Sequence, residues 1–349
     1  MSGKISGFIV RLMTIAIGML LICAPVWAEG GEPAYPYHGV QFDKFVDQSF
    51  AYSGPSEPKR FYDWMDRAYR ETRSRIPGNK SLLLGDFLAS RRALLTATKD
   101  PAKKSATEIE VSANVHKLIK AMIPRFSLDR GFEFRNVVKY GERQCFLQSV
   151  LIAGMLQRMG MNAGVAMVYR NITGQPTNNG HAITLLKLPD GKSIIVDASE
   201  PEPFARHQGL FVRTRGYQYV DPVYVKKSDM ISFYRASGRI EKINTDRVHG
   251  LDLAFLDSQF WFYRGERAKG GLILLPRTKE GLEASAAALR TSVKLCPANP
   301  LSVYTLGRVY QAQGKSAGAA KMFTKAYALY ARFGWVPDGA KECFASVQH

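Results

Sequence analysis

Apolar residues recur at helical spacing in the first third of the chain. The spacing predicts helices over residues 59–75, 81–98 and 105–123. Pro77-Gly78 stops the first, and Ser105 with Glu108 three residues later forms a capping box that opens the third. We expect these helices to be scaffold, packed beside a core. Residues 29–57, rich in Gly, Pro, Tyr and Ser, are expected to form an irregular lead-in.

From residue 145 the pattern changes to one helix followed by short strands. Residues 145–159 are apolar on most positions, and Gly160 stands where a helix stop belongs. Asp190-Gly191 is a hairpin signal between two alternating segments. The expected elements are a helix at 145–159, a strand at 163–169, a loop at 171–180 and strands at 181–188 and 193–198.

The last third of the chain returns to helical patterns. Residues 216–264 are aromatic and mixed, and we expect them to extend the core and to end in a linking helix. An alanine-rich helix follows from Glu280, Asn299-Pro300 breaks it, and a helix–turn–helix runs on to about Arg332.

The N-terminus has the layout of a secretory signal peptide. Lys4 and Arg11 precede or open an apolar run, and small residues at Val26 and Ala28 come before Glu29. We expect cleavage after Ala28 and export to a periplasm, cell envelope or extracellular space. The alternative is an uncleaved membrane anchor, because residues 12–28 are about long enough to cross a thin bilayer.

The chain is strongly basic, with 349 residues and a formal net charge of +18. Residues 1–28 hold two basic and no acidic residues, so their removal leaves 18 − 2 = +16. Nucleic acid is the usual partner of such a charge, but export argues against it. We therefore expect no nucleic acid, and attraction to anionic envelope polymers or lipid headgroups.

Three residues on successive elements have the types that a cysteine enzyme needs. Cys145 begins a helix, whose free N–H groups and positive dipole end favour a thiolate. His181 opens a strand and Asp197 lies on the next one, so counting from the turn places both at the same end of the hairpin. A carboxylate there can hold an imidazole that takes the proton of the thiol. His207 and His249 are rival bases, but neither lies on an alternating strand with an Asp after it. Each residue taken alone is more often structural.

The same residues carry a resemblance to a known family. Gln144-Cys145-Phe146-Leu147-Gln148-Ser149-Val150-Leu151, running to Arg158-Met159-Gly160-Met161-Asn162-Ala163, resembles the nucleophile helix of the transglutaminase-like superfamily. His181-Ala182 through Asp190-Gly191 to Val196-Asp197-Ala198 is similar to that family's His strand, turn and Asp strand. The resemblance covers roughly residues 130–200.

The resemblance implies an α+β fold of papain-like type, a nucleophile helix packed on an antiparallel sheet. It implies Cys145 as nucleophile, His181 as general base and acid, and Asp197 as the residue that orients the imidazole. The family acts on amide bonds by hydrolysis or transfer, without a metal or organic cofactor, and some bacterial members have no known activity. Three departures concern the substrate: Ile183 stands where a Trp is common, Ala198-Ser199 follows Asp197, and Gln144 precedes the nucleophile. Its side-chain amide is a candidate oxyanion donor.

The C-terminal region resembles a tetratricopeptide repeat. The matching positions, which depart at Ala331 where Pro is usual, are Val303, Leu306-Gly307, Tyr310, Gly314, Ala319, Phe323 and Ala326. Residues 280–297 look like the second helix of a degenerate earlier repeat. About one and a half repeats are too few for an independent solenoid. The tail therefore either packs on the catalytic domain or docks a partner peptide.

The sequence thus predicts four segments and leaves two functions open. The segments are a signal peptide (1–28), the lead-in (29–57), a transglutaminase-like domain with N-terminal helices (58–265) and a tetratricopeptide-like tail (266–349). One function is a cysteine-dependent hydrolase or acyltransferase acting on peptides or proteins. The other is a non-catalytic envelope binding or scaffold protein with a relic fold and a peptide-binding tail.

Overall fold

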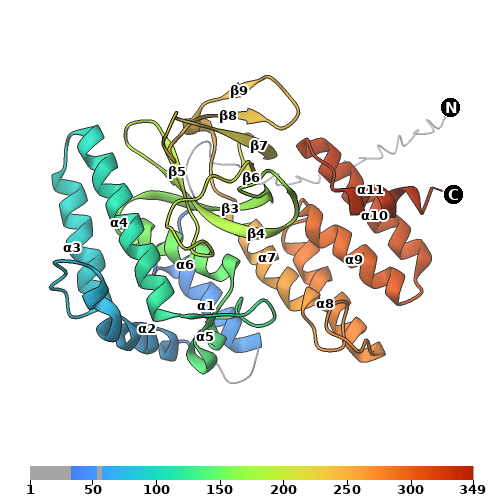
Figure 1. The fold of residues 1–349 in the computed structure, drawn as a ribbon. Helices are drawn as coiled ribbons and strands as arrows, with labels where there is room; N and C mark the ends of the chain where they lie inside the picture. Colours follow the sequence, from blue (N-terminus) through green and yellow to red (C-terminus); the bar gives the residue numbers. More distant parts are fainter. Residues whose placement is uncertain (1–32, 53–56, 349) are drawn as a thin grey trace, which may run out of the picture. The chain divides into compact units, whose positions relative to one another are not determined.

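The structure is a computed structural model that describes residues 33–52 and 57–348 (Figure 1). The predicted signal peptide, residues 1–28, lies outside the described residues. Within the described ranges, no helix combines the length and apolar character needed to cross a membrane. The described residues belong to one compact unit, whose architecture is mixed, with helices around an antiparallel sheet.

The N-terminal half of this unit is mainly helical. Its elements are α1 (Val40–Tyr52), α2 (Lys59–Thr72), η1 (Arg73–Arg75), α3 (Leu84–Ala97), α4 (Pro101–Met122), β1 (Arg125–Phe126), α5 (Phe134–Tyr140), β2 (Glu142–Arg143) and α6 (Cys145–Arg158). The helices predicted at 59–75 and 81–98 are present as α2 with η1 and as α3.

Two predictions in this half were wrong. The lead-in at 29–57 contains α1, whose Phe42, Phe45 and Phe50 are buried on one side of the helix. The Gly, Pro and Ser residues on both sides of α1 obscured the helical spacing of these apolar residues. The third helix begins a turn earlier than Ser105, because the side chain of Asp100 caps it by accepting a hydrogen bond from Lys103 N at 2.7 Å.

The sheet follows α6 and closes on itself. Its strands are β3 (Asn162–Arg170), β4 (Pro176–Lys187), β5 (Ser193–Val196), β6 (Gly209–Arg213), β7 (Tyr217–Tyr224), β8 (Ile231–Ala236) and β9 (Lys242–Ile243). They lie in the order β5-β4-β3-β6-β7-β8-β9, all antiparallel. A further pairing of Ser193 with Ile231 joins β5 to β8. β4 starts at Pro176, so the loop predicted to reach residue 180 is shorter.

The closed sheet separates two apolar clusters. The inner core lies within the sheet and includes Ile183, Leu185 and Ile195. The helix-side core includes Ala182 and Leu186 from the same strand β4, together with α6, which is buried along almost its whole length. Alternate residues of β4 therefore face different cores, as strand geometry requires.

The C-terminal region is a stack of helices that continues from the sheet. Its elements are α7 (Leu253–Glu266), α8 (Lys279–Leu295), α9 (Pro300–Ala312), α10 (Ser316–Phe333) and α11 (Asp338–Ala345). Each helix from α8 to α11 packs on the helix before it, and α10 also packs against β7 (Figure 1). Trp335, just after α10, lies 4.9 Å from the ring of Tyr169 and 5.3 Å from that of Tyr219. The tail shares the helix-side core through Val303, Leu306 and Phe333.

Candidate active site

Cys145 is the first residue of α6. The backbone of Gln144 is extended there, with φ −130° and ψ 162°, so the helix begins abruptly and its first N–H groups lie beside the thiol. The side chain is 4% exposed, and its Sγ lies 3.6 Å from the carbonyl oxygen of Gly180. A thiol in this position sits where the partial positive charge of the helix favours a negative sulfur.

Two hydrogen bonds join α6 to β4 one turn below the thiol. The hydroxyl of Ser149 donates to the carbonyl of Ala182, at 3.0 Å, and that of Thr184 donates to the carbonyl of Ser149, also at 3.0 Å. All three residues are buried. These bonds fix the position of α6 along β4. They therefore also fix the position of Cys145 relative to His181, the residue next to Ala182 on the strand.

His181 and Asp197 meet at the open end of the β4–β5 hairpin. The last pair of the ladder at this end is Thr184 with Val196. His181 lies three residues before Thr184 and Asp197 directly follows Val196, so both lie beyond that pair, at the same end of the hairpin. The Nε2 atom of His181 lies 2.7 Å from Oδ2 of Asp197. The other oxygen of Asp197 accepts a hydrogen bond from Ser199 N at 2.8 Å.

The charges of these groups reinforce one another. Burial alone would lower the pKa of His181, but hydrogen bonds with Asp197 and with the Cys145 side chain raise the pKa to about 10. Burial alone would raise the pKa of Asp197, but the hydrogen bonds of His181 and His207 hold it well below its usual range. The structure therefore brings the three predicted residues into one hydrogen-bonded chain: thiol, imidazole, carboxylate.

The two rival bases have different positions. His207 contacts the same carboxylate: its Nε2 lies 2.8 Å from Oδ2 of Asp197, but the ring is only 2% exposed. His249 lies by the far turn, where its Nδ1 is 3.3 Å from Lys187 Nζ. His181, with a side chain 24% exposed, is the imidazole of the three that combines contact with Cys145 and access to solvent.

Four further residues take part in the site, and their roles were not predicted from the sequence. The amide of Gln148 donates to Ser199 Oγ at 2.8 Å, and its oxygen accepts from the guanidinium of Arg143 at 2.9 Å. This chain supports the turn that carries the carboxylate of Asp197. Tyr263, from α7, donates to the carbonyl of Gly180 at 3.1 Å. Arg143 and Gln148 flank Cys145 in the sequence, but only the fold shows that they reach the Asp turn.

Two residues noted as departures from the family pattern are both buried. Gln144 is 1% exposed and its Oε1 has no hydrogen-bond partner. Its side chain does not cap the helix. Ile183 points into the inner core. It therefore contributes packing and is turned away from the face of β4 that carries Ala182.

His181, Asp197 and His207 also have the side-chain types of a metal site, with ligand atoms within 4.8 Å of one another. Both imidazole Nε2 atoms, however, lie at 2.7 and 2.8 Å from one carboxylate oxygen. Two ligands that share a tetrahedral zinc ion are about 3.4 Å apart. The spacing fits hydrogen bonds better than shared coordination.

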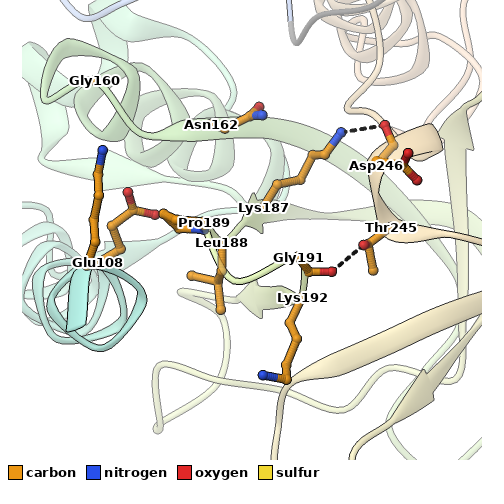
Figure 2. Close-up of a pocket in the computed structure, with 11 residues that line it drawn as sticks. Glu108, Gly160, Asn162, Lys187, Leu188, Pro189, Gly191, Lys192, Thr245 and Asp246 are labelled. Carbon is orange, nitrogen blue, oxygen red and sulfur yellow. Dashed lines mark hydrogen bonds between the residues drawn. The ribbon is translucent and has the colours of Figure 1, made fainter. Parts of the chain in front are cut away.

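A separate hollow of about 250 Å³ lies at the turn end of the same hairpin, opposite His181 and Asp197 (Figure 2). Glu108 of α4, 2% exposed, lies beside Leu188 and Pro189 there. Burial raises the pKa of Glu108 to about 7, although Lys104 opposes the rise. None of the residues that line this hollow is a cysteine or a histidine.

The comparisons with known proteins add no assignment. No protein-family model matches the sequence, and a search of curated proteins gives no match. Any inference about function must therefore start from the positions of Cys145, His181 and Asp197.

Proposed function

We propose that this chain is an exported cysteine-dependent hydrolase or acyltransferase that acts on amide bonds of peptides or proteins. The observation that carries the proposal is the chain from Cys145 through His181 to Asp197, with His181 Nε2 at 2.7 Å from the carboxylate. A helix that begins with the nucleophile and packs on an antiparallel sheet is also what a papain-like, transglutaminase-like fold would present. The proposed site uses no metal or organic cofactor.

The geometry supports a two-step acyl transfer. His181 takes the proton of Cys145, and the thiolate attacks the amide carbonyl carbon. The oxyanion that forms would lie near the N–H groups at the start of α6 and the amide of Gln144. The imidazolium then gives its proton to the leaving amine, and a thioester remains on Cys145. Water or a second amine, deprotonated by His181, releases the acyl group and restores the thiol.

A non-catalytic binding protein is the second candidate. The observation in its favour is that Cys145 is only 4% exposed, so a substrate must approach past Gly180 and His181. Under this alternative the triad is a relic, and a peptide partner binds the groove or the helical tail.

Alkylation of the thiols separates the two candidates. Cys296 is a matched internal control, because it is 3% exposed but its contact is Tyr217 in place of an imidazole. At pH 7 we expect iodoacetamide to modify Cys145 at least about tenfold faster than Cys296. His181→Ala should remove that difference. Equal slow rates at both thiols in the wild type would reject the enzyme and favour the binding protein.

Activity and export have their own tests. Cys145→Ala should abolish amide hydrolysis or transfer while the thermal transition stays in place, because the change removes only the sulfur atom of the side chain. Intact-mass measurement of exported protein should show a chain that begins near Glu29. A mass that includes residues 1–28 would instead support the membrane-anchored alternative.

A further inference from the structure

His207 lies against the same carboxylate oxygen as His181. Its Nε2 is 2.8 Å from Oδ2 of Asp197, and the two imidazole rings are 5.3 Å apart. Asp197 is fully buried. A buried carboxylate with a single partner at this oxygen can turn about its side-chain torsions, whereas two donors define its direction.

The tautomer of His207 follows from its surroundings. Its Nδ1 is buried and has no hydrogen-bond partner. An imidazolium would bury an unpaired N–H donor there, which costs more than leaving an acceptor lone pair unfilled. The neutral imidazole with its proton on Nε2 leaves no unpaired N–H at Nδ1 and places a donor beside Oδ2 of Asp197. His207 therefore donates a hydrogen bond to Asp197.

Backbone hydrogen bonds hold His207 in place without using the carboxylate of Asp197. The chain reverses after β5, and Asp197 N donates to the carbonyl of Pro203 at 3.0 Å. The hydroxyl of Tyr224, on β7, donates to the carbonyl of His207 at 2.7 Å. The ring is therefore a fixed point against which the carboxylate is set.

We propose that His207 is a positioning residue: it fixes the carboxylate of Asp197 so that Oδ2 faces His181. The proposal rests on the proposed function and deepens it. The orientation of Asp197 then decides how well the imidazolium of His181 is held while Cys145 is a thiolate. His207 is 2% exposed, and its side-chain hydrogen bond in the site is the one to Asp197, so its effect on the imidazole of His181 runs through the carboxylate.

Other charged groups around Asp197 do not replace His207. Lys120 and His116 of α4 both contact the carbonyl of Glu200, on the turn after Asp197. Arg143 contacts Gln148, which reaches the turn through Ser199. These groups hold the backbone of the turn, and the donors on the carboxylate are His181, His207 and Ser199 N.

The titration of His181 tests this directly. The protein used is the chain without residues 1–28, with ¹³C-labelled histidine. We expect the titration midpoint of His181, measured by NMR, to lie near pH 10. His207→Phe removes the donor but keeps a ring, and should lower the midpoint by about 1 pH unit, towards that of Asp197→Asn. His207→Gln keeps an amide donor and should stay near the wild type. His116→Phe, which changes a buried imidazole of α4 that contacts the same turn, is the matched control and should leave the midpoint unchanged.

Alkylation supplies a second readout. His207→Phe should slow the reaction of Cys145 with iodoacetamide at pH 7 about tenfold, and His207→Gln should restore it. If His207→Phe does not fold, Tyr224→Phe loosens the same loop and should shift the midpoint in the same direction by a smaller amount.

The outcomes are distinct. An unchanged midpoint in His207→Phe, a raised one, or an equal shift in the Phe and Gln variants would each overturn the positioning role. Slow alkylation of wild-type Cys145 would reject the enzyme instead. A lowered midpoint found together with that result would still support the placement of Asp197 by His207.

Discussion

The hydroxyl of Tyr263 lies 3.1 Å from the carbonyl oxygen of Gly180, the residue that precedes His181. The same oxygen is 3.6 Å from Sγ of Cys145. The helix α7, which shares the helix-side core with α6, thus holds the backbone that carries the candidate base. The ring of Tyr263 also stacks on Phe132, with centroids 5.6 Å apart, so the hydroxyl is held in a fixed direction.

Tyr263→Phe should loosen this attachment. We expect a loss of about 1 kcal/mol in the free energy of unfolding, the usual value of one buried hydrogen bond, and alkylation of Cys145 about threefold slower, because His181 is less well placed. Tyr69→Phe is the matched control: its hydroxyl also donates to a backbone carbonyl, that of Ser81, but on helices away from the site. Equal effects of the two variants on alkylation would show that Tyr263 is only structural.

The raised pKa of His181 predicts how stability depends on pH. Because the folded pKa is about 10 and the ordinary value is 6.5, the stabilisation is complete below pH 6.5 and is lost as pH rises towards 10. We expect the free energy of unfolding to fall by about 2 to 4 kcal/mol across that window. His181→Gln should lack most of this slope. Denaturant melts at several pH values measure it, and parallel curves for both proteins would contradict the ion pair.

The raised pKa of Glu108, at the other end of the hairpin, predicts a second dependence of stability on pH. Its pKa is raised to about 7 from an ordinary 4.5, so the folded protein loses stability as pH rises from 4.5 through 7. Glu108→Gln cannot ionise, and should be more stable than the wild type by about 1 kcal/mol at pH 8. The advantage should vanish near pH 4. Glu110→Gln, an exposed change on the same helix, should show no such pH-dependent difference.

The helical tail should depend on the rest of the chain. Leu289 of α8 is fully buried and packs against Gly265 of α7, where a side chain would come within 2.6 Å of it. A fragment of residues 278–349 exposes this face, so we expect weak helicity and no cooperative thermal transition. A sharp melt by circular dichroism would show an independent module and would favour a partner-binding tail.

A substitution at Trp335 tests the packing of the tail on the sheet within the whole protein. Trp335→Ala removes its contacts with Tyr169 and Tyr219 and should cost about 2 kcal/mol of unfolding free energy. A two-state transition with a lower midpoint is expected. Separate melting of tail and core would show that the two are less coupled than the packing indicates.

Much of the site could be predicted because it depends on local pattern. The helix from Cys145 follows from continuous apolar positions, and the meeting of His181 with Asp197 follows from counting back from the turn at Asp190-Gly191. Both rest on periodicity and turn chemistry, which act within about twenty residues.

The remaining features depend on contacts between distant segments. His207 reaches Asp197 only because the chain reverses through Pro203, and Tyr263 reaches Gly180 from 83 residues away. Neither follows from a periodic pattern. The helix α1 was missed for another reason: Gly and Pro on both sides obscured the buried face of Phe42 and Phe45.

The hairpin that carries His181 and Asp197 forms a wall shared by the inner core and the helix-side core. Its backbone amides are therefore covered on both faces, and they can exchange with solvent deuterium only when the whole unit opens. We therefore expect the backbone around these two residues to exchange slowly. Under the proposed function, any opening that admits a substrate to Cys145 would come from segments outside this hairpin, while His181 and Asp197 keep their positions.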